Sequence, residues 1–195
     1  MTMALDAQGE ASDDALLARF AAGDRAAAHA LTLRLTPLAL RVARRMLNDA
    51  DEAEDVAQEA MVRLWRIAQG WQPGQARVTT WLYRVAMNLA IDRLRRGRRN
   101  QPLDTVEEPE DGRPAAVETM IAADRARALE AALMTLPERQ RQAVVLRHLE
   151  GCANPEIAEI MAIGVEAVES LIARGKRGLM AALDGRRAEL GYDNG

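Results

Sequence analysis

Residues 100 to 118 divide this chain into two parts. This segment, NQPLDTVEEPEDGRPAAVE, holds three prolines and six acidic residues against one basic residue. Prolines interrupt helices, and so polar a stretch buries too little apolar surface to offset the entropy of ordering it. We therefore expect an acidic, flexible linker over residues 100–120, so the 195 residues fold as two separate units.

The sequence on both sides of the linker is typical of helices. Hydrophobic residues make up 49% of the chain and aromatic residues only 3%, so the strong helix formers Ala and Leu dominate. Apolar residues recur at spacings of three and four, and no long alternating run indicates a strand. We predict an all-α fold of two small helical domains. The expected ranges are a disordered N-terminus over 1–11, a first domain over 12–99, the linker over 100–120, a second domain over 121–184 and a tail over 185–195.

Capping residues predict where the helices begin. A first helix is expected over 13–20, and Asp24 caps a second that runs to about Leu35. Thr36-Pro37 predicts a new helix, because a hydroxyl followed by proline is a common start signal. The remaining expected caps are Asp49 or Asp51, Thr79 or Thr80, and Asn154.

The helix after Asp49 has an acidic stripe roughly opposite its apolar face. Glu52, Asp55 and Glu59 share this stripe, and Gln58 lies beside them. One interpretation is a solvated face with acids placed favourably near a helix N-terminus. The other is a docking surface for a basic partner.

The segment from Trp65 to Arg99 combines aromatic residues with arginines. Four of the six aromatic residues lie in it, and Arg93 to Arg99 contains five arginines in seven residues. Arginines bind phosphates, and exposed rings stack on unpaired bases at about 1–3 kcal/mol each. Alternatively, Trp65 and Trp81 belong to the core and the arginines form a solvated helix end. Trp71 lies in a loop with Gly and Pro, so we expect it to be the most exposed tryptophan.

The end of the chain predicts a helix-turn-helix. A short helix from Glu156 to Met161, a turn over Ala162-Ile163-Gly164 and a longer helix from Val165 to about Leu183 follow one another. This motif places its second helix in the DNA major groove. Many helical hairpins share this spacing.

The sequence contains no catalytic signature, so we expect no enzyme, no cofactor and no metal. A Gly-rich phosphate loop, a zinc-protease motif and a nucleophile elbow are all missing from it. His148 and Cys152 are four residues apart, but two ligands are too few for a structural zinc site. The single cysteine and the lack of a signal peptide or a long apolar run predict a cytoplasmic protein.

Three segments together resemble the extracytoplasmic-function group of sigma-70 family factors. Residues 51–65, DEAEDVAQEAMVRLW, are similar to the helix with which that family binds core RNA polymerase. Residues 80–92, TWLYRVAMNLAID, followed by arginines, are similar to its −10 element helix. Leu136-Pro137, Arg141, Gly151 and Glu156-Ile157-Ala158 are similar to its −35 recognition domain. The resemblance covers residues 13–99 and 122–183.

The resemblance implies a role for each segment in a promoter-specificity subunit. The residues implied to bind core polymerase are Glu52, Asp55, Val56, Gln58 and Glu59. Those implied to bind the −10 strand are Trp71, Arg77, Trp81, Tyr83, Arg84, Asn88, Asp92, Arg95, Arg96, Arg98 and Arg99. Those implied for −35 binding through the helix-turn-helix are Asn154, Glu156, Val165, Glu166, Ala167, Glu169, Ser170, Arg174, Lys176 and Arg177. The loop from Trp71 to Val78 would capture an extruded base.

The recognition helix departs from the family pattern. Glu169 and Leu171 stand where the family usually has basic residues. Glu169 repels phosphate but can accept a hydrogen bond from a cytosine amine.

The resemblance also implies partners: core RNA polymerase, promoter DNA and an inhibitory anti-sigma factor. The whole sequence looks closest to the alphaproteobacterial sigma-E type, whose antagonist is a zinc-binding protein of the ChrR class. We expect a monomer when the chain is free of partners. Two alternatives stay open: a stand-alone helix-turn-helix regulator, and a sigma mimic that only sequesters an anti-sigma factor.

Overall fold

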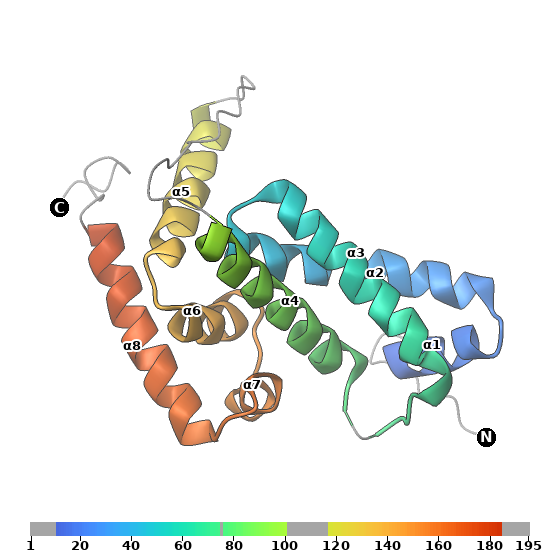
Figure 1. Cartoon of the computed structure of the whole chain (residues 1–195). Helices are drawn as coiled ribbons and strands as arrows, with labels where there is room; N and C mark the ends of the chain where they lie inside the picture. The colour runs from blue at the N-terminus through green and yellow to red at the C-terminus, as the bar shows by residue number, and fades with distance from the viewer. Residues whose placement is uncertain (1–10, 75, 101–116, 185–195) are drawn as a thin grey trace.

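The computed structural model describes residues 11–74, 76–100 and 117–184, and their side chains apart from those of 98–100 and 117–123. The regular elements of the first domain are helices packed side by side (Figure 1). They are α1 Asp13–Ala21, α2 Arg25–Leu47, α3 Ala50–Ile67, the short 3-10 helix η1 Ala68–Gly70 and α4 Val78–Asn100. The expected N-terminal segment over 1–11 and the linker lie almost wholly outside the described residues.

Side-chain caps begin the first three helices. Ser12 accepts a hydrogen bond from the Ala15 amide at 3.2 Å, and Asp24 accepts from the Ala26 and Ala27 amides at 2.9 and 3.2 Å. Asp49 accepts from the Glu52 amide at 2.9 Å. Asn48 ends α2 with a φ of +54°, in the left-handed region that Asn tolerates. The expected caps Asp24 and Asp49 are confirmed.

The prediction of a helix break at Thr36-Pro37 is wrong. Helix α2 runs without interruption from Arg25 to Leu47, with Pro37 exposed inside it. Proline removes one backbone hydrogen bond and normally disrupts a helix interior. Here Leu35 and Ala39, on either side of the proline, are completely buried. Burial of this continuous apolar face holds the helix together because tertiary packing outweighs local propensity.

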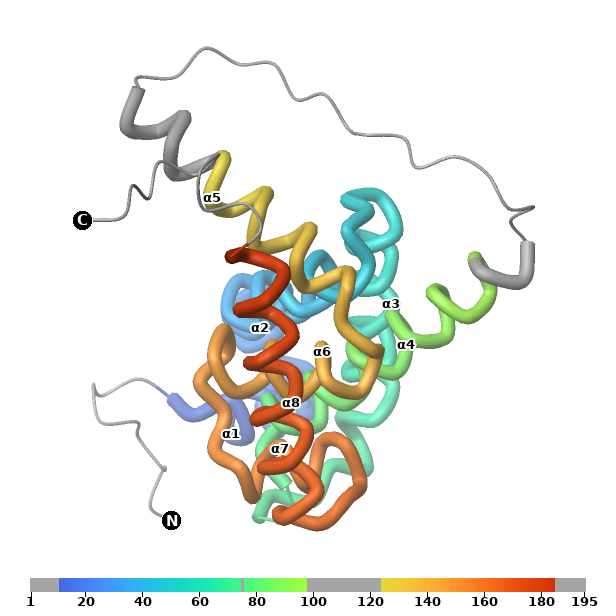
Figure 2. Tube along the Cα trace, turned by 90° about the vertical axis from the view of Figure 1, so that its left-hand side faces the viewer, coloured from blue at the N-terminus to red at the C-terminus, as the bar shows by residue number. Residues whose placement is uncertain are grey.

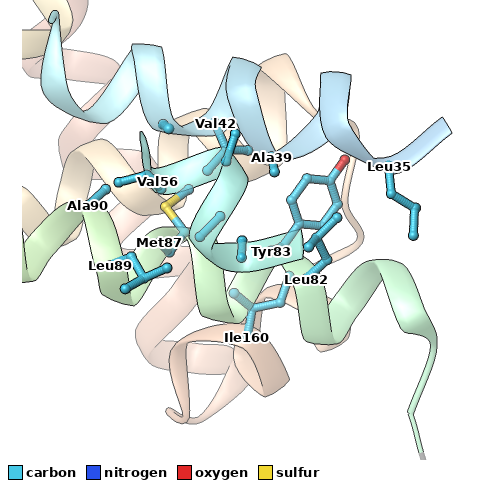
Figure 3. Packing of buried hydrophobic residues seen from close by; sticks show 14 of the residues in the cluster. Leu35, Ala39, Val42, Val56, Leu82, Tyr83, Met87, Leu89, Ala90 and Ile160 are labelled. Carbon is cyan, nitrogen blue, oxygen red and sulfur yellow. The ribbon is translucent and has the colours of Figure 1, made fainter. Parts of the chain in front are cut away.

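The core of the first domain lies between α2, α3 and α4. Val42 from α2, Val56 from α3 and Leu82 from α4 are each completely buried, and they meet in the region that Figure 3 shows. Burial of such side chains contributes about 1.5–3 kcal/mol each. This packing fixes which faces of α3 and α4 remain available at the surface.

The second domain is built from shorter elements. They are α5 Val117–Met134, α6 Glu138–Val144, the π-helical turn η2 Val145–Leu149, α7 Asn154–Met161 and α8 Val165–Asp184. Helix α8 comes very close to α6 through Gly175. A Cβ atom added at Gly175 would lie 2.6 Å from Val144 Cγ2 and 3.1 Å from the backbone oxygen of Gln140. Glycine is therefore needed for this approach.

The two domains lie against each other. Helix α7 packs on α4 and α5 packs on α2, as Figure 1 shows and as Figure 2 shows from the side of the second domain. Ile160 of α7 lies beside α4 in Figure 3 and shares one apolar cluster with Leu82. None of the helices within the described ranges has the length and apolar character needed to cross a membrane.

Candidate functional site

The acidic stripe of α3 lies at the surface. Glu52, Asp55 and Gln58 are exposed, and Glu59 is partly exposed. Arg63 donates to Glu59 at 2.8 Å and holds the pKa of that carboxyl below its usual value. Val56 is the exception among the five residues implied to bind polymerase. Its side chain is completely buried, so it supports the helix from the core side and has no surface to offer a partner.

Arg93 of α4 crosses to this stripe. Its guanidinium forms ion pairs with the carboxylates of Glu52 and Asp55, and it donates to the backbone oxygen of Glu52 at 3.2 Å. Arg93 is the first arginine of the run after Ile91-Asp92 and was not among the predicted DNA-binding residues. The ion pairs lower the negative charge of the stripe and occupy one of the five arginines.

Trp71 is less exposed than the sequence indicates. Its indole N–H donates to Asp14 at 2.7 Å, and its ring lies edge-on to Trp81 with centroids 6.4 Å apart. Both rings are half-buried. Trp65 is likewise half-buried, against Phe20 at 4.6 Å. Loop composition did not reveal that Asp14, 57 residues away, anchors this ring.

Tyr83 is buried and cannot stack on a base in this arrangement. Only 7% of its surface is exposed, and its hydroxyl donates to Glu150 of the second domain at 3.1 Å. Burial, reinforced by the Glu150 charge, raises the pKa of Tyr83 well above its usual value. The phenol is therefore protonated at neutral pH and can donate this hydrogen bond.

The other predicted −10 residues divide into two groups. The exposed ones are Arg77, Asn88, Asp92, Arg95 and Arg96. Arg84 is half-buried and donates to the backbone oxygen of Glu159 at 2.7 Å. Arg95 donates to Glu138 at 3.1 Å. Arg98 and Arg99 lie outside the residues whose side chains are described.

Helices α7 and α8 form the predicted helix-turn-helix. Ala162 ends α7 with a φ of +51°, and the Ile163 amide donates to the Ala158 oxygen at 3.1 Å. Val168 is completely buried and anchors α8. The outward face of α8 is exposed at each predicted position: Val165, Glu166, Ala167, Glu169, Ser170, Arg174, Lys176 and Arg177.

Of the two predicted −35 residues of α7, Glu156 contacts the first domain. Glu156 is half-buried and accepts from the Thr80 hydroxyl at 2.9 Å. Asn154 is half-buried as the first residue of α7, and the cap position belongs to Ala153, which provides no side-chain hydrogen bond. The prediction of Asn154 as a cap is therefore wrong. Neither Thr79 nor Thr80 is a cap, because α4 begins at Val78 and includes both.

His148 and Cys152 do not form a site. His148 is exposed and Cys152 is buried, and burial raises the pKa of the Cys152 thiol to about 12. Within the ranges that the structure describes, no three His, Cys, Asp or Glu side chains gather as a metal site would require.

Sequence reasoning missed a set of residues that join the domains. Arg41 and Arg45 of α2 form ion pairs with Glu150, the first at 3.3 Å. These partners are separated by 109 and 105 residues, so no local pattern relates them. The one local signal was the i, i+4 spacing of Arg41 and Arg45, two like charges on one helix face that call for an acidic partner.

Comparisons with known proteins agree with this arrangement of domains. Residues 31–100 match sigma-70 region 2, and residues 126–179 match sigma-70 region 4. The ECF RNA polymerase sigma factor SigM of Mycobacterium tuberculosis is 36% identical over 176 residues, which cover 89% of this chain and 86% of SigM. The RNA polymerase sigma-H factor of Pseudomonas aeruginosa is 35% identical over 181 residues, covering 88% of this chain and 93% of that protein.

Solved structures show the same fold. CnrH, in complex with the cytosolic domain of CnrY, superposes with a TM-score of 0.67 at 26% identity, over 89% of this chain and 97% of CnrH. The sigma factor RpoE of Bartonella quintana, in complex with the anti-sigma factor NepR, superposes with a TM-score of 0.63 over 78% of this chain and 94% of that one. At 20% identity, the second likeness concerns the fold alone.

The matches to sigma-70 regions 2 and 4 and the similarity to SigM and to the sigma-H factor show the family. The chain belongs to the ECF group of sigma-70 family factors, transcription initiation factors that direct RNA polymerase to promoters and are not enzymes.

Proposed function

We propose that this sigma factor reads the −35 element with α8 and the −10 strand with α4, while α3 binds core polymerase. The observation that carries the proposal is the exposed outward face of α8, from Val165 to Arg177, on a helix whose inner face is anchored by Val168. A recognition helix needs this geometry to enter the major groove. Arg174 and Arg177 supply charge for phosphates.

Glu166 and Glu169 shape the base preference of α8. Both are exposed in its first two turns, where a recognition helix meets base edges. A carboxylate accepts a hydrogen bond from the cytosine amine, so these residues favour cytosine at the positions they reach.

Two surfaces support the other roles. The exposed acids Glu52 and Asp55 with Gln58 form a surface on α3 for a basic partner, which is the role proposed for core polymerase. Arg77, directly before α4, and Asn88 and Arg96 on α4 are exposed and offer donors to the −10 strand and its phosphates.

We also propose that an anti-sigma factor in the cytoplasm inhibits the chain. Two proteins with this fold were solved with a bound partner: CnrH, at 26% identity, with the cytosolic domain of CnrY, and the Bartonella RpoE with the anti-sigma factor NepR. The finer proposal, a ChrR-class antagonist of the alphaproteobacterial sigma-E type, adds a zinc ion that belongs to the partner. Co-expression with candidate antagonists, followed by metal analysis of the purified complex, tests it.

The main test is reconstituted transcription. RNA 5′ ends mapped after overexpression identify the promoters, and run-off transcription with core polymerase then measures initiation. We expect Arg95→Glu combined with Arg96→Glu to abolish promoter opening and to spare antagonist binding. The control Arg25→Glu combined with Arg139→Glu reverses two exposed charges elsewhere and should leave opening intact.

Two results would overturn the proposal. Absence of initiation from every genomic promoter fragment, with core polymerase present and antagonists removed, would contradict the promoter-reading assignment. Tight, specific duplex binding without polymerase would instead favour a stand-alone regulator.

A further inference from the structure

Helix α1 supplies the hydrogen-bond partner that holds Trp71. The indole N–H donates to the Asp14 carboxylate at 2.7 Å, and a carboxylate makes a stronger hydrogen bond than a neutral acceptor does. The match to sigma-70 region 2 begins at residue 31, whereas α1 ends at Ala21. Asp14 therefore contacts the predicted −10 region from outside the matched segment.

Helix α1 is fixed well enough to serve as an anchor. Leu17 is completely buried, and Phe20 packs against Trp65 of α3 with ring centroids 4.6 Å apart. Figure 1 shows α1 beside the end of α3, and α1 packs against η1 and α4. Asp14 therefore has a defined position relative to the start of α4.

The hydrogen bond to Asp14 orders a pair of rings. Trp71 contacts Trp81, the fourth residue of α4. The two ring planes meet at 84°, edge to face, with centroids 6.4 Å apart, an arrangement that aromatic pairs favour. Both rings are half-buried, so each keeps part of its surface exposed. Trp81 belongs to a long helix, whereas Trp71 follows η1 in a loop, where the contact with Asp14 fixes its ring.

The order of such a ring matters for binding an unpaired base. A side chain that becomes ordered only on binding loses rotamer freedom, and this loss weakens binding. Taking a base out of the duplex has its own cost, so a ring that is already in place lowers the total. The negative charge of Asp14, by contrast, repels phosphates. Position and charge therefore act on strand binding with opposite signs, and substitutions can separate them.

We infer that Asp14 is a positioning residue for the −10 strand: it holds Trp71 edge-on against Trp81, so the ring pair is ordered before a base leaves the duplex. Asp14 acts through Trp71 and needs no contact with the strand. This inference rests on the proposed −10 role of α4 and adds to it a contribution from α1.

Fluorine NMR of the full-length chain labelled with 5-fluorotryptophan tests the contact. The chain has three tryptophans, and the variants Trp71→Phe and Trp81→Phe assign their resonances. We expect Asp14→Ala to shift the resonances of Trp71 and Trp81 and to leave that of Trp65 in place. Asp14→Asn keeps a side-chain oxygen that can accept from the indole and should restore most of the original spectrum. An unchanged Trp71 resonance in Asp14→Ala would overturn the contact.

Binding of a single strand by the holoenzyme tests the role of the contact. The probe is a fluorescent non-template oligonucleotide from the mapped promoter, titrated with the full chain assembled on core polymerase. We expect Asp14→Ala to weaken binding roughly three- to tenfold, which corresponds to ordering one side chain. Asp14→Asn should bind at least as tightly as the unchanged chain, because it keeps the acceptor and loses the repelling charge. Equal or tighter binding by Asp14→Ala would overturn the inference.

Asp13 provides the matched control. It is the neighbouring acid in the same turn of α1, and its carboxylate forms an ion pair with Arg34 at 3.4 Å. Asp13→Ala removes the same charge from the same end of the helix, so it should leave the tryptophan resonances and strand binding nearly unchanged. An equal loss in Asp13→Ala and Asp14→Ala would assign the effect to the start of α1 as a whole and overturn the specific role of Asp14. Circular dichroism checks that each variant keeps its helices.

An abasic probe shows whether the ring pair meets a base. An abasic site moved through the −10 positions should weaken binding of the unchanged chain at one position. Asp14→Ala should add little further loss there, because both changes remove one interaction. Losses that add fully at every position would overturn the inference.

Trp81→Ala separates the inference from the proposed function. It should weaken strand binding roughly fivefold or more, since it removes a stacking surface. No loss in Trp81→Ala would contradict the −10 role of the rings, and the inference with it. A loss in Trp81→Ala without one in Asp14→Ala would overturn the inference alone and leave the proposed function and the family assignment intact.

Discussion

Helices α4 and α8 are both proposed to bind promoter DNA, yet their surfaces are used very differently. Three arginines of α4 are paired within the chain: Arg84 and Arg95 contact the second domain, and Arg93 contacts α3. Helix α8 keeps its outward face exposed and carries Glu166 and Glu169 near its start. The helix with the dense run of arginines, α4, is therefore less available to DNA in this arrangement than α8, whose surface carries both acidic and basic residues.

This difference teaches that charge in a sequence does not measure charge at a surface. Arg93 lies in the most basic stretch of the chain but neutralises two acids of a neighbouring helix. Burial and pairing decide availability, and both depend on residues far away along the chain. Four measurements would break or sharpen the comparison.

The largest effect is expected in the interior of α4. Leu82→Ala removes a completely buried side chain and should cost about 3 kcal/mol of unfolding free energy, since a cavity remains. Chemical denaturation followed by circular dichroism measures it. Ala substitution of the exposed Leu33, on α2, should change stability by no more than about 0.5 kcal/mol. A cost below about 1 kcal/mol at Leu82 would contradict the burial of α4.

Close packing against α6 makes α8 sensitive to substitution of Gly175. Gly175→Ala places a Cβ against Val144 and the Gln140 backbone, which should cost about 1–3 kcal/mol in the second domain. Gly97→Ala is the matched change in α4, where an added Cβ meets nothing within 4 Å. That variant should gain up to about 1 kcal/mol from helix propensity. Denaturation curves of equal stability for both variants would contradict the close approach of α8 to α6.

The salt dependence of promoter binding distinguishes arginines that contact phosphates from arginines that are paired with acids inside the chain. Arg177→Ala on α8 should lower the slope of log Kobs against log salt for promoter binding by the holoenzyme by about one unit. Arg93→Ala should leave that slope unchanged, because Glu52 and Asp55 already neutralise its charge. Filter-binding titrations at several salt concentrations measure both. Equal slopes for the two variants would remove the distinction between α4 and α8.

The smallest expected effect is a change in stability at acid pH that depends on Asp24. Arg19 and the amides of Ala27 and Ala26 lower the pKa of Asp24 below 3.8. A lowered carboxyl pKa contributes stability above its unfolded value, and this contribution is lost as pH falls through the folded value. The advantage of the unchanged chain over Asp24→Asn should therefore be full at pH 6 and shrink below about pH 3.8. Thermal melts across this range measure it, and a constant difference would contradict the pairing.

Local signals predicted much of the fold. The caps Asp24 and Asp49, the helix-turn-helix over α7 and α8, and the two helical parts follow from spacing and short-range chemistry. The predictions that the structure contradicts share one cause. Pro37 is held inside α2 by packing, and Tyr83 and Trp71 find partners 67 and 57 residues away. Tertiary contacts decide these positions, and no periodicity within one helix records them.

The candidate site shows the same limit. The positions on α8 could be predicted because exposure there follows the helical period once the buried Val168 is identified. Val56 was included among the polymerase-binding residues through the family resemblance, and its side chain is completely buried in the core. The contact at Glu150 had no local signature at all, since it depends on how two domains meet.

The buried contact at Glu150 also links the sequence changes that the two domains can tolerate. Its carboxylate receives donors from Arg41, Arg45 and Tyr83 of the first domain, and a buried carboxylate that loses its partners is strongly destabilising. A substitution on one side of this contact therefore calls for a compensating change on the other, so we expect the two domains to vary together at these positions.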